Sequence, residues 1–472
     1  MKQSTALTVS TLAVVLWVLS CEKAPNPLNP VHEGNPVDEG DVQYSAKQTS
    51  GQRPQMPVAP FFLPDDDRPT LAKMGTTVPD ITVAAASTVV VDDDPGADFT
   101  TIQAAVNSGA SKILVRPGNY AENVTIGPSA KVTLIGSNGA GSSMVTGVAG
   151  TAGPIIDVLA GSTVHINDLT VDGGSAMAGG TVFGIRYDQA NGSIKNVEVL
   201  NTRDASGGAQ GLGIRVQSSG ASAKVTAEKC IVSNYTRVGI NGNGAGVKLT
   251  VKQCTISGPV LPRVHAPNGI QISRGAQGTV LGNEVDNNPS PNPPGGAGSG
   301  ILLFCAGKTH VQNNKVTEAD LGIAIADNAN AKVNNNEITD SVFDGISLQF
   351  IGLFFGGPLG CDPSVSPAHD NLVKNNKIRK SGETGISLAN FDLASDPATP
   401  NDNQIEINDI ADSGIDGIHV FDGSDNLFRN NRMKTSVGTD SVDDTIGAGT
   451  AGTANTWTNN RCTTSLPAGL CN

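Results

Sequence analysis

A phrase that recurs from residue 184 onward limits what the chain can fold into. Its first part is Gly-Ile, a variable residue and an aliphatic residue; its second part is Asn, any residue, and Ile or Val. The glycine of the first part stands at Gly184, Gly213, Gly239, Gly269, Gly300, Gly322, Gly345, Gly385 and Gly417. The second part begins at Asn196, Asn283, Asn314, Asn336, Asn376, Asn408, Asn431 and Asn460, with Asp168, Cys230 and Cys254 in equivalent positions. Several copies share one spacing between the two parts, which predicts a stack of similar coils.

Each coil is predicted to consist of short strands. The aliphatic residues alternate with period two, so one face of each strand points inward. Stacking places equivalent residues about 4.8 Å apart. An inward Asn at a sharp bend can then bond the backbone and the Asn of the next coil, so we assign these asparagines a structural role. Gly is abundant, at 56 residues, and aromatic residues make up only 4%, which also favours short turns and small strands over helices.

The repeat resembles that of the right-handed parallel β-helix superfamily, which includes pectate lyases, pectin esterases, polygalacturonases and alginate epimerases. The segments 98–106 and 113–124 are similar to the opening of that superfamily, especially of pectin esterases. The resemblance implies an all-β, single-stranded right-handed parallel β-helix over residues 81–472. A short helix carrying Ile102, Ala105 and Val106 on one side is expected to cap its first coil.

The N-terminus predicts export. Lys2 precedes an apolar stretch that is too short to span a bilayer, so residues 1–20 are interpreted as an export signal. The sequence Val18-Leu19-Ser20-Cys21 resembles the bacterial lipobox, which implies lipidation of Cys21. Glu22 at the next position then favours an outer-membrane lipoprotein, on the cell surface or the periplasmic face. An ordinary cleaved signal with an incidental Cys21 is the alternative.

A flexible tether is predicted for residues 21–80, because many prolines interrupt a polar stretch. Asp65, Asp66 and Asp67 within it could bind a cation, although a solvated turn is the simpler interpretation. The net charge of −13 argues against nucleic acid as a partner. An acidic polysaccharide would need a local basic groove or a bridging cation, so calcium is a candidate cofactor.

Six cysteines follow Cys21 and suit an oxidising compartment. We predict three disulfides: Cys230 with Cys254, Cys305 with Cys361, and Cys462 with Cys471. Free stacked thiols are the rival interpretation for Cys230 and Cys254, because a bridge there could be too tight. The spacing of Cys and His predicts no metal site.

A binding face is expected where the variable residue of the Gly-Ile phrase points outward. The resulting column contains Arg186, Arg215, Asn241, Gln271, Leu302, Ala324, Ser347, Ser387 and His419. A neighbouring column contains Asp188, Gln217, Ser273, Phe304, Ala326 and Gln349. Long insertions flank the same strand at 201–211, 257–268, 287–299, 349–370 and 389–401. Loops on both sides of one sheet would form a cleft for an extended polymer, which is also where the superfamily binds oligosaccharide.

Candidate substrate-binding residues are Arg186, Asp188, Gln217, Arg263, Gln271 and His419. Arg186 and Arg215 are expected one strand spacing apart, which suits an anionic ligand unless Asp188 and Asp204 compensate their charge. The alternative is that Arg186 and Arg215 are an ordinary solvated pair with nearby acids and bind no ligand.

His265 and Arg215 are the candidate catalytic residues. His265 could abstract the proton next to a uronic carboxylate while an arginine stabilises the enolate. A histidine on a long polar loop can equally be functionally silent. Asp370-Asn371, Asp402-Asn403 and Asp425-Asn426 each start an equivalent strand, so we interpret them as a repeated turn rather than a metal site.

Three functions follow from this sequence. The first is binding or processing of an acidic polysaccharide by lyase or epimerase chemistry, in a monomeric, lipid-anchored protein. The alternative is a non-catalytic glycan-binding or adhesive lipoprotein. The third resembles the β-helix accessory proteins of periplasmic copper delivery, but no clustered copper ligands support it. The paired-Asp motif of polygalacturonases does not occur in its expected context, and the Asp-Pro-His-Asp motif of alginate epimerases is not reproduced, so no catalytic residue is carried over from the resemblance.

Overall fold

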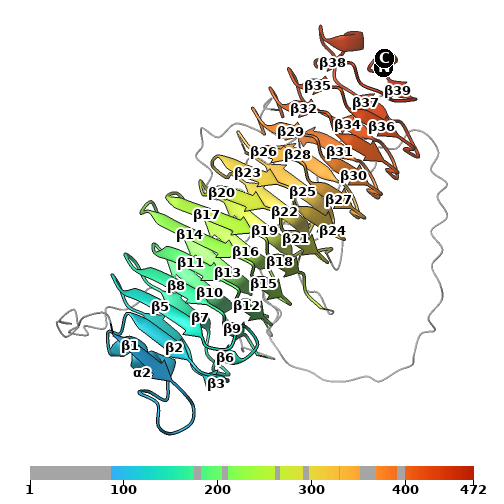
Figure 1. The fold of residues 1–472 in the computed structure, drawn as a ribbon. Helices are drawn as coiled ribbons and strands as arrows, with labels where there is room; N and C mark the ends of the chain where they lie inside the picture. The colour runs from blue at the N-terminus through green and yellow to red at the C-terminus, as the bar shows by residue number, and fades with distance from the viewer. Residues whose placement is uncertain are drawn as a thin grey trace, which may run out of the picture. The chain divides into compact units, whose positions relative to one another are not determined.

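A computed structural model describes residues 87–174, 182–204, 211–260, 266–290, 297–328, 330–350, 368–390 and 399–471. These residues all belong to the second of the two units into which the chain divides, 56–472. They form a stack of coils whose strands pair in parallel in three long sheets (Figure 1). None of the helices among the described residues is long and apolar enough to span a membrane.

We name the sheets A, B and C. Within the described residues sheet A has 14 strands, sheet B has 12 and sheet C has 13. Sheet A contains β1 (Thr88–Val91), β2 (Lys112–Val115), β5 (Lys131–Gly136), β8 (Thr163–Asn167), β11 (Asn191–Lys195), β14 (Ala223–Glu228), β17 (Val247–Lys252), β20 (Gln277–Leu281), β23 (Thr309–Gln312), β26 (Lys332–Asn334), β29 (Leu372–Lys374), β32 (Gln404–Glu406), β35 (Leu427–Arg429) and β38 (Thr456–Thr458).

Sheet B contains β3 (Gly118–Ala121), β6 (Ser143–Thr146), β9 (Thr170–Asp172), β12 (Glu198–Leu200), β15 (Ile231–Ser233), β18 (Thr255–Ser257), β21 (Glu284–Asp286), β24 (Lys315–Thr317), β27 (Glu337–Thr339), β30 (Lys377–Arg379), β33 (Asp409–Ala411) and β36 (Arg432–Lys434).

Sheet C contains β4 (Val124–Ile126), β7 (Gly153–Val158), β10 (Val182–Asp188), β13 (Leu212–Gln217), β16 (Val238–Asn243), β19 (Asn268–Ser273), β22 (Ser299–Phe304), β25 (Leu321–Ala326), β28 (Ile346–Phe350), β31 (Ile386–Asn390), β34 (Ile418–Val420), β37 (Ser441–Asp443) and β39 (Ser465–Leu466). A short 3-10 helix, η3 (Thr450–Gly452), lies near the C-terminal end. One turn of the chain therefore contributes a strand to each sheet, which confirms the predicted parallel β-helix.

The helix α2 (Ile102–Asn107) packs against the first strands and confirms the predicted cap. Thr101 Oγ1 accepts a hydrogen bond of 3.2 Å from Ala104 N, as an N-cap residue does. Glu122 accepts from Ile102 N at 2.7 Å and from Gln103 N at 2.8 Å. Two side chains thus satisfy the free N–H groups of the first turn.

The interior explains the Gly-Ile phrase. The isoleucines align in register down sheet C and are fully buried, as at Ile270 and Ile301. A Cβ at Gly269 would lie 2.3 Å from Val285 Cγ1, and one at Gly300 would lie 2.2 Å from Val316 Cγ1. Glycine is needed because the strand of sheet B in the same coil packs directly on the backbone at this corner.

The predicted asparagine ladder runs from Asn283 to Asn460 at the bend between sheets A and B. Asn314 Oδ1 accepts from Asn283 N at 3.0 Å and from Asn283 Nδ2 at 2.9 Å. Asn283 Nδ2 also donates to Val251 O at 3.0 Å. The pattern repeats at Asn336, Asn376, Asn408, Asn431 and Asn460. These buried amides therefore satisfy one another and the backbone across the coils.

The predicted phase of the ladder is wrong at its N-terminal end. Register places Leu169 and Val197, both fully buried, in line with Cys230. Asp168 and Asn196 occupy the preceding position, with φ of 57° and 50°, and Asn196 Nδ2 donates to Asp168 Oδ1 at 3.1 Å. Asn and Asp tolerate this left-handed conformation. The polar residue at this position was therefore mistaken for a ladder residue, although the ladder position is the next residue in the chain.

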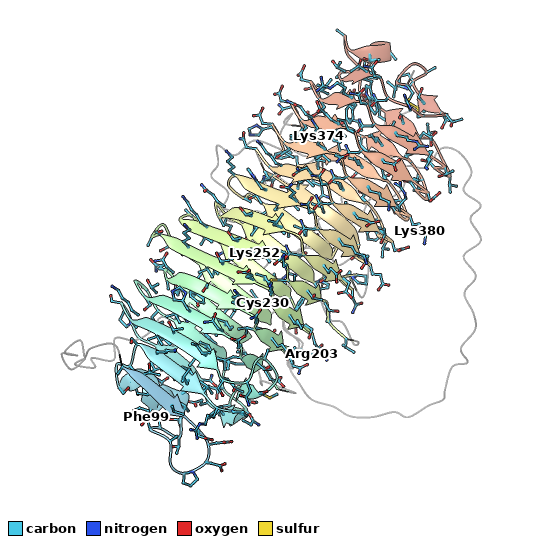
Figure 2. The ribbon with its side chains drawn as sticks, in the orientation of Figure 1. Phe99, Arg203, Cys230, Lys252, Lys374 and Lys380 are labelled. Carbon is cyan, nitrogen blue, oxygen red and sulfur yellow. A yellow bond between two sulfur atoms is a disulfide. The ribbon has the colours of Figure 1, made fainter. Side chains whose placement is uncertain are left out.

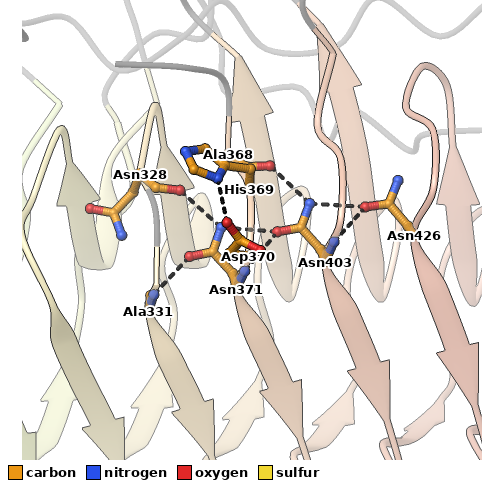
Figure 3. Close-up of polar contacts among 8 residues, drawn as sticks. All are labelled: Asn328, Ala331, Ala368, His369, Asp370, Asn371, Asn403 and Asn426. Atoms are coloured by element: carbon orange, nitrogen blue, oxygen red, sulfur yellow. Dashed lines mark hydrogen bonds and ion pairs between the residues drawn. The ribbon is translucent and has the colours of Figure 1, made fainter. Parts of the chain in front are cut away.

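A second ladder connects the Asp-Asn pairs that the sequence suggested form a turn (Figure 3). Asn403 Oδ1 accepts from Asn371 N at 3.1 Å and Nδ2 at 3.0 Å, and Asn426 accepts equivalently from Asn403. Asp370 and Asp402 precede these asparagines at φ of 54° and 53°. The repeated-turn interpretation is confirmed.

Cys230 and Cys254 are free and buried, so the predicted disulfide between them is wrong (Figure 2). Cys230 N donates to Cys254 Sγ at 3.3 Å, and Cys254 N donates to Asn283 Oδ1 at 2.9 Å. The two thiols thus take the place of two ladder amides, because each lies against the backbone of a neighbouring coil without forming a bond between the sulfur atoms.

The other cysteines differ in outcome. Cys462 and Cys471 form the predicted disulfide, with Cα atoms 5.7 Å apart. Cys305 is disulfide-bonded, while its predicted partner Cys361 lies outside the described residues. Cys21, the export signal and the tether also lie outside them.

Candidate functional site

The outward column on sheet C is where the sequence predicted it. Register aligns its members from coil to coil: Asp157, Arg186, Arg215, Asn241, Gln271, Leu302, Ala324, Ser347, Ser387 and His419. The second column is also in register, and Asn243 and Ala389 join it. The alternation of inward and outward side chains was therefore sufficient to predict these two columns.

A third column on the same face was not predicted. It consists of the residue before the glycine of each phrase: Phe183, Leu212, Val238, Asn268, Ser299, Leu321, Asp344, Thr384 and Asp416. Most of these residues lie at the start of a strand of sheet C, whereas Asp344, Thr384 and Asp416 lie two residues before theirs. Three columns together define the outer face of sheet C.

The middle of this face is closed to solvent, which differs from the continuous cleft expected. Leu302 and Ala324 are completely buried and belong to an apolar cluster with Phe304 and Leu321. This cluster is separate from the β-helix interior, which contains Ile301 and its equivalents. The apolar cluster divides the outer face into two polar zones.

The arginine zone comprises Asp157, Phe183, Arg186 and Arg215, with Asp188 and Gln217 beside them. Arg186 donates to both oxygens of Asp157, from Nε at 2.9 Å and Nη2 at 2.7 Å. Burial lowers the pKa of Arg186, but the hydrogen bond and the charge of Asp157 outweigh it and raise the pKa overall. The guanidinium carbons of Arg186 and Arg215 lie 5.6 and 5.4 Å from the centre of the Phe183 ring, within cation–π range.

Asp157 was not predicted, because the repeated Gly-Ile phrase that defines the column starts at Gly184, two residues before Arg186. Asp188 and Asp204 were expected to compensate the arginines, whereas the bidentate partner of Arg186 comes from the preceding coil. The pattern Ile156-Asp157-Val158 has the same alternation and could have revealed it.

The acid zone lies on β28, β31 and β34, several coils further along. Ser387 Oγ donates to Asp344 Oδ2 at 2.6 Å and lies 2.8 Å from Ser347 Oγ. Gln349 Nε2 donates to Ser347 Oγ at 2.8 Å. The contacts form a directed chain from Gln349 through the two serines to the Asp344 carboxyl.

His419 has a carboxylate at each ring nitrogen. Nδ1 lies 2.8 Å from Asp416 Oδ2, and Nε2 lies 3.2 Å from Asp444 Oδ2. The ring stacks on Phe421 with centroids 3.6 Å apart. Asp416 and Asp444 therefore hold the imidazole between them. Only 9% of His419 is exposed, while Asp444 lies at the exposed rim.

Two carboxyl groups of this zone have raised pKa values. Burial raises the pKa of Asp344 to about 6, although hydrogen bonds from Ser387 and Thr384 N partly oppose the change. Burial, together with the charge of Asp344, raises the pKa of Glu383 to about 7. Glu383 is partly exposed, whereas Asp344 is buried. Groups with such values can give and take protons near neutral pH.

The predicted site residues do not form one site. Seven strand spacings separate Arg215 from His419, or roughly 34 Å along the stack. Gln271 lies between them and bonds Asn268 Nδ2 at 3.2 Å and Ser273 Oγ at 3.3 Å. His265 and Arg263 lie outside the described residues, so their catalytic and binding roles stay predictions.

Metal ligands are sparse in the described part of the chain. Asp92, Asp93 and Asp94 have oxygen atoms within 4.8 Å of one another, on a partly exposed segment after β1. A calcium ion could take such oxygens. This cluster lies far in sequence from both polar zones of sheet C, and calcium stays a prediction.

Comparisons with known proteins agree with the fold. A family model described as a right-handed β-helix region matches residues 183–349. Together with the register of the three sheets, this match defines the described body as a right-handed parallel β-helix. No curated protein matches the chain.

Several solved structures are similar at low identity. The A-module of mannuronan C-5 epimerase AlgE6 from Azotobacter vinelandii is 16% identical, covers 77% of this chain and 94% of its own, and has a TM-score of 0.46. A GH136 lacto-N-biosidase from Eubacterium ramulus is 11% identical, with 71% and 64% covered and a TM-score of 0.49. A GH87 α-1,3-glucanase from Streptomyces thermodiastaticus is 15% identical, with 81% and 70% covered and a TM-score of 0.40.

Proposed function

We propose that the protein acts on a carbohydrate polymer through acid–base chemistry in the acid zone. The observation that carries this proposal is the pair of carboxyl groups with raised pKa values, Asp344 at about 6 and Glu383 at about 7, beside His419. Paired titratable groups with separated, shifted pKa values are typical of catalytic sites.

The partly exposed Glu383 suits the role of proton donor. A glycosidic oxygen placed against it would receive the proton as the bond to the sugar carbon breaks. Water would supply the hydroxyl group, and its remaining proton would pass to a carboxylate of the same zone. Most enzymes that hydrolyse glycosides use two carboxyl groups, and in those that invert the sugar one is the acid and the other the base.

The surroundings also suit a sugar. Gln349 is 1% exposed, and its Oε1 has no hydrogen-bond partner among the described residues. A buried, unpaired acceptor favours a ligand that brings a donor, such as a hydroxyl group. Phe421 and the imidazole of His419 add a flat stacked surface. The resemblance of segments 98–106 and 113–124 to the opening of the pectin esterases also points to a carbohydrate.

Charge favours a neutral sugar in the acid zone over a uronic acid. The zone contains four acids, Asp344, Glu383, Asp416 and Asp444, and a single histidine, whose ring nitrogens face Asp416 and Asp444. Lyase or epimerase chemistry on a uronic-acid polymer requires a cation at the substrate carboxylate, and the described arginines of sheet C lie in the other zone. Lyase or epimerase chemistry by His265 and Arg215 stays a prediction.

A polysaccharide panel tests the proposal. Neutral and acidic polymers are incubated with the full chain, and both new reducing ends and unsaturated products are measured. We expect new reducing ends from at least one polymer, reduced roughly 100-fold or more by Glu383→Gln, which removes the proposed proton donor. Glu284→Gln on the outer side of sheet B serves as the control. The absence of turnover across the panel would contradict catalysis.

Non-catalytic glycan binding is the second candidate. It is favoured by the burial of Ser347 and Ser387, which are 0% exposed, because a covered floor limits access to the acid groups. This function predicts retention on a glycan array without product. Product formation by the wild-type chain would decide against it.

The anchor is a separate proposal. We expect Cys21 to be acylated after removal of residues 1–20, so that the tether presents the β-helix at the outer membrane. Metabolic labelling with a fatty acid should mark the wild-type protein and leave Cys21→Ala unlabelled. An unlabelled wild-type protein would contradict the anchor and leave the acid-zone proposal intact.

A further inference from the structure

Arg237 is a buried arginine at the edge of the arginine zone. It immediately precedes β16, where its N donates to Gly211 O at 2.9 Å and its O accepts from Asn268 N at 2.8 Å. These bonds fix it between the coils of β13 and β19. Only 7% of the residue is exposed, and it is the one arginine among the described residues that is classed as buried. Arginine is almost never buried to this extent unless it is paired.

The contacts of Arg237 do not balance its charge. Nη1 donates to Ala266 O at 3.3 Å, which is its single side-chain hydrogen bond within the described residues. It forms no ion pair there. Burial lowers its pKa to about 10, which still leaves the guanidinium protonated at neutral pH. A buried cation with one long bond to a neutral carbonyl is an unfavourable arrangement in the absence of an anion.

Other arginines of the described chain contrast with it. Arg116, Arg186, Arg379 and Arg429 each pair with a carboxylate, although all four are more exposed than Arg237. At these four positions, a carboxylate of the protein balances the charge of the arginine. At Arg237, the most desolvated position, no described residue supplies one.

The surroundings of Arg237 connect it to the binding face. Val238, the next residue, packs with Phe183 and Leu212 in a small apolar cluster. Phe183 is the ring contacted by Arg186 and Arg215. Arg237 is thus connected, through Val238, to a surface that combines cations with an aromatic ring.

We propose that Arg237 binds an oxyanion, a carboxylate or sulfate group, of an acidic glycan that occupies the arginine zone. This inference rests on the proposed carbohydrate function and adds an acidic binding subsite to it. The guanidinium fork matches the two oxygens of such a group, and the low polarity of the site strengthens the contact. A planar carboxylate could come from a uronic acid and a tetrahedral group from a sulfated sugar.

The test is a calorimetric titration of the full chain with trigalacturonate, its methyl ester and inorganic sulfate. We expect trigalacturonate to bind wild type and Arg432→Met, an exposed-site control, equally well. Arg237→Met should weaken this binding at least tenfold, since a hydrogen-bonded charge pair is lost. The uncharged ester should bind all three proteins weakly, and binding of sulfate alone would identify the tetrahedral group as the better ligand.

Stability provides a second readout. Without ligand, Arg237→Met should unfold at the same or a higher temperature than wild type, because it removes a buried, uncompensated charge. A lower unfolding temperature would show that Arg237 is structural and would overturn the inference, as would equal binding of trigalacturonate by wild type and variant or no binding of either anion. Because the polysaccharide panel measures product, it can fail or succeed independently of this binding experiment.

Discussion

Ser387 donates a hydrogen bond of 2.6 Å to Asp344 across two neighbouring coils of sheet C. The two residues are 43 positions apart in the chain, and only the regular stacking brings them together. The same stacking places Asp416 and His419 in the next coil. A polar centre thus arises from residues of successive coils rather than from a local motif.

The buried Asp344 carboxyl should make stability depend on pH. Its pKa is about 6 in the folded protein against an ordinary value of 3.8, so the folded state retains the proton as pH rises through this window. Stability should therefore be full below pH 4 and fall between about pH 4 and 6, with a total loss of about 3 kcal/mol. Asp344→Asn should remove this loss. Urea unfolding at pH 4 and pH 8 measures it, and an equal pH dependence in wild type and variant would refute it.

The asparagine ladder should dominate the stability of the C-terminal coils. Asn376 is 1% exposed, accepts two bonds from Asn336, and donates to Val333 O and Asn408 Oδ1. Asn376→Ala should cost about 2–4 kcal/mol, because several buried groups lose their partners. Asn335→Gly, at an exposed position with φ of 56°, should change stability by less than about 0.5 kcal/mol. Similar losses in both variants would argue against the ladder.

The two free thiols offer an opposite prediction. Cys254 Sγ lies 3.6 Å from Ala227 O, the carbonyl equivalent to the one that Asn283 Nδ2 contacts. Cys254→Asn should extend the ladder by one amide and raise the free energy of unfolding by about 1 kcal/mol. Thermal unfolding under reducing conditions measures the change. Labelling of the unfolded wild-type chain with iodoacetamide, without reductant, should modify both Cys230 and Cys254. Protection of both from labelling would show that they form a disulfide.

An alternating column of charges on sheet B should help to fix the register. Glu284, Lys315, Glu337, Lys377, Asp409 and Arg432 follow one another across the strands. Lys377 Nζ lies 2.6 Å from Glu337 Oε1. Lys377→Glu would place three acids in sequence and should lower stability by about 1 kcal/mol. The loss should shrink in 1 M salt, roughly as screening predicts; a salt-independent loss would indicate a cause other than charge.

The fold was predictable because the repeat specifies it at every coil. Period-two alternation fixes which residues face outward, so the column from Arg186 to His419 was assigned correctly. The glycine of the phrase marks the corner where Val285 and Val316 contact the backbone. Local pattern and packing agree at these positions, so little further information was needed.

The site was less predictable because it depends on contacts between coils. Glu383 and Asp344 lie at or just before the start of strands, where alternation gives no direction, and their pKa values come from burial that the sequence does not display. The residue before each phrase glycine was the missed signal, since Asp344 and Asp416 both occupy it. Cys230 and Cys254 show the reverse error: equivalent positions were read as a bond, whereas stacking directs each thiol at a neighbouring carbonyl.

The most direct test of the acid-zone proposal is the pH–rate profile of wild type and Glu383→Gln on the polysaccharide that gives product. With a pKa of about 7, Glu383 is protonated below neutrality and ionised above it, so the wild-type rate of a reaction that needs its proton should fall above about pH 7. Glu383→Gln should be slower by roughly 100-fold or more and lose that fall. A Glu383→Gln protein with the wild-type rate and profile would contradict the central claim.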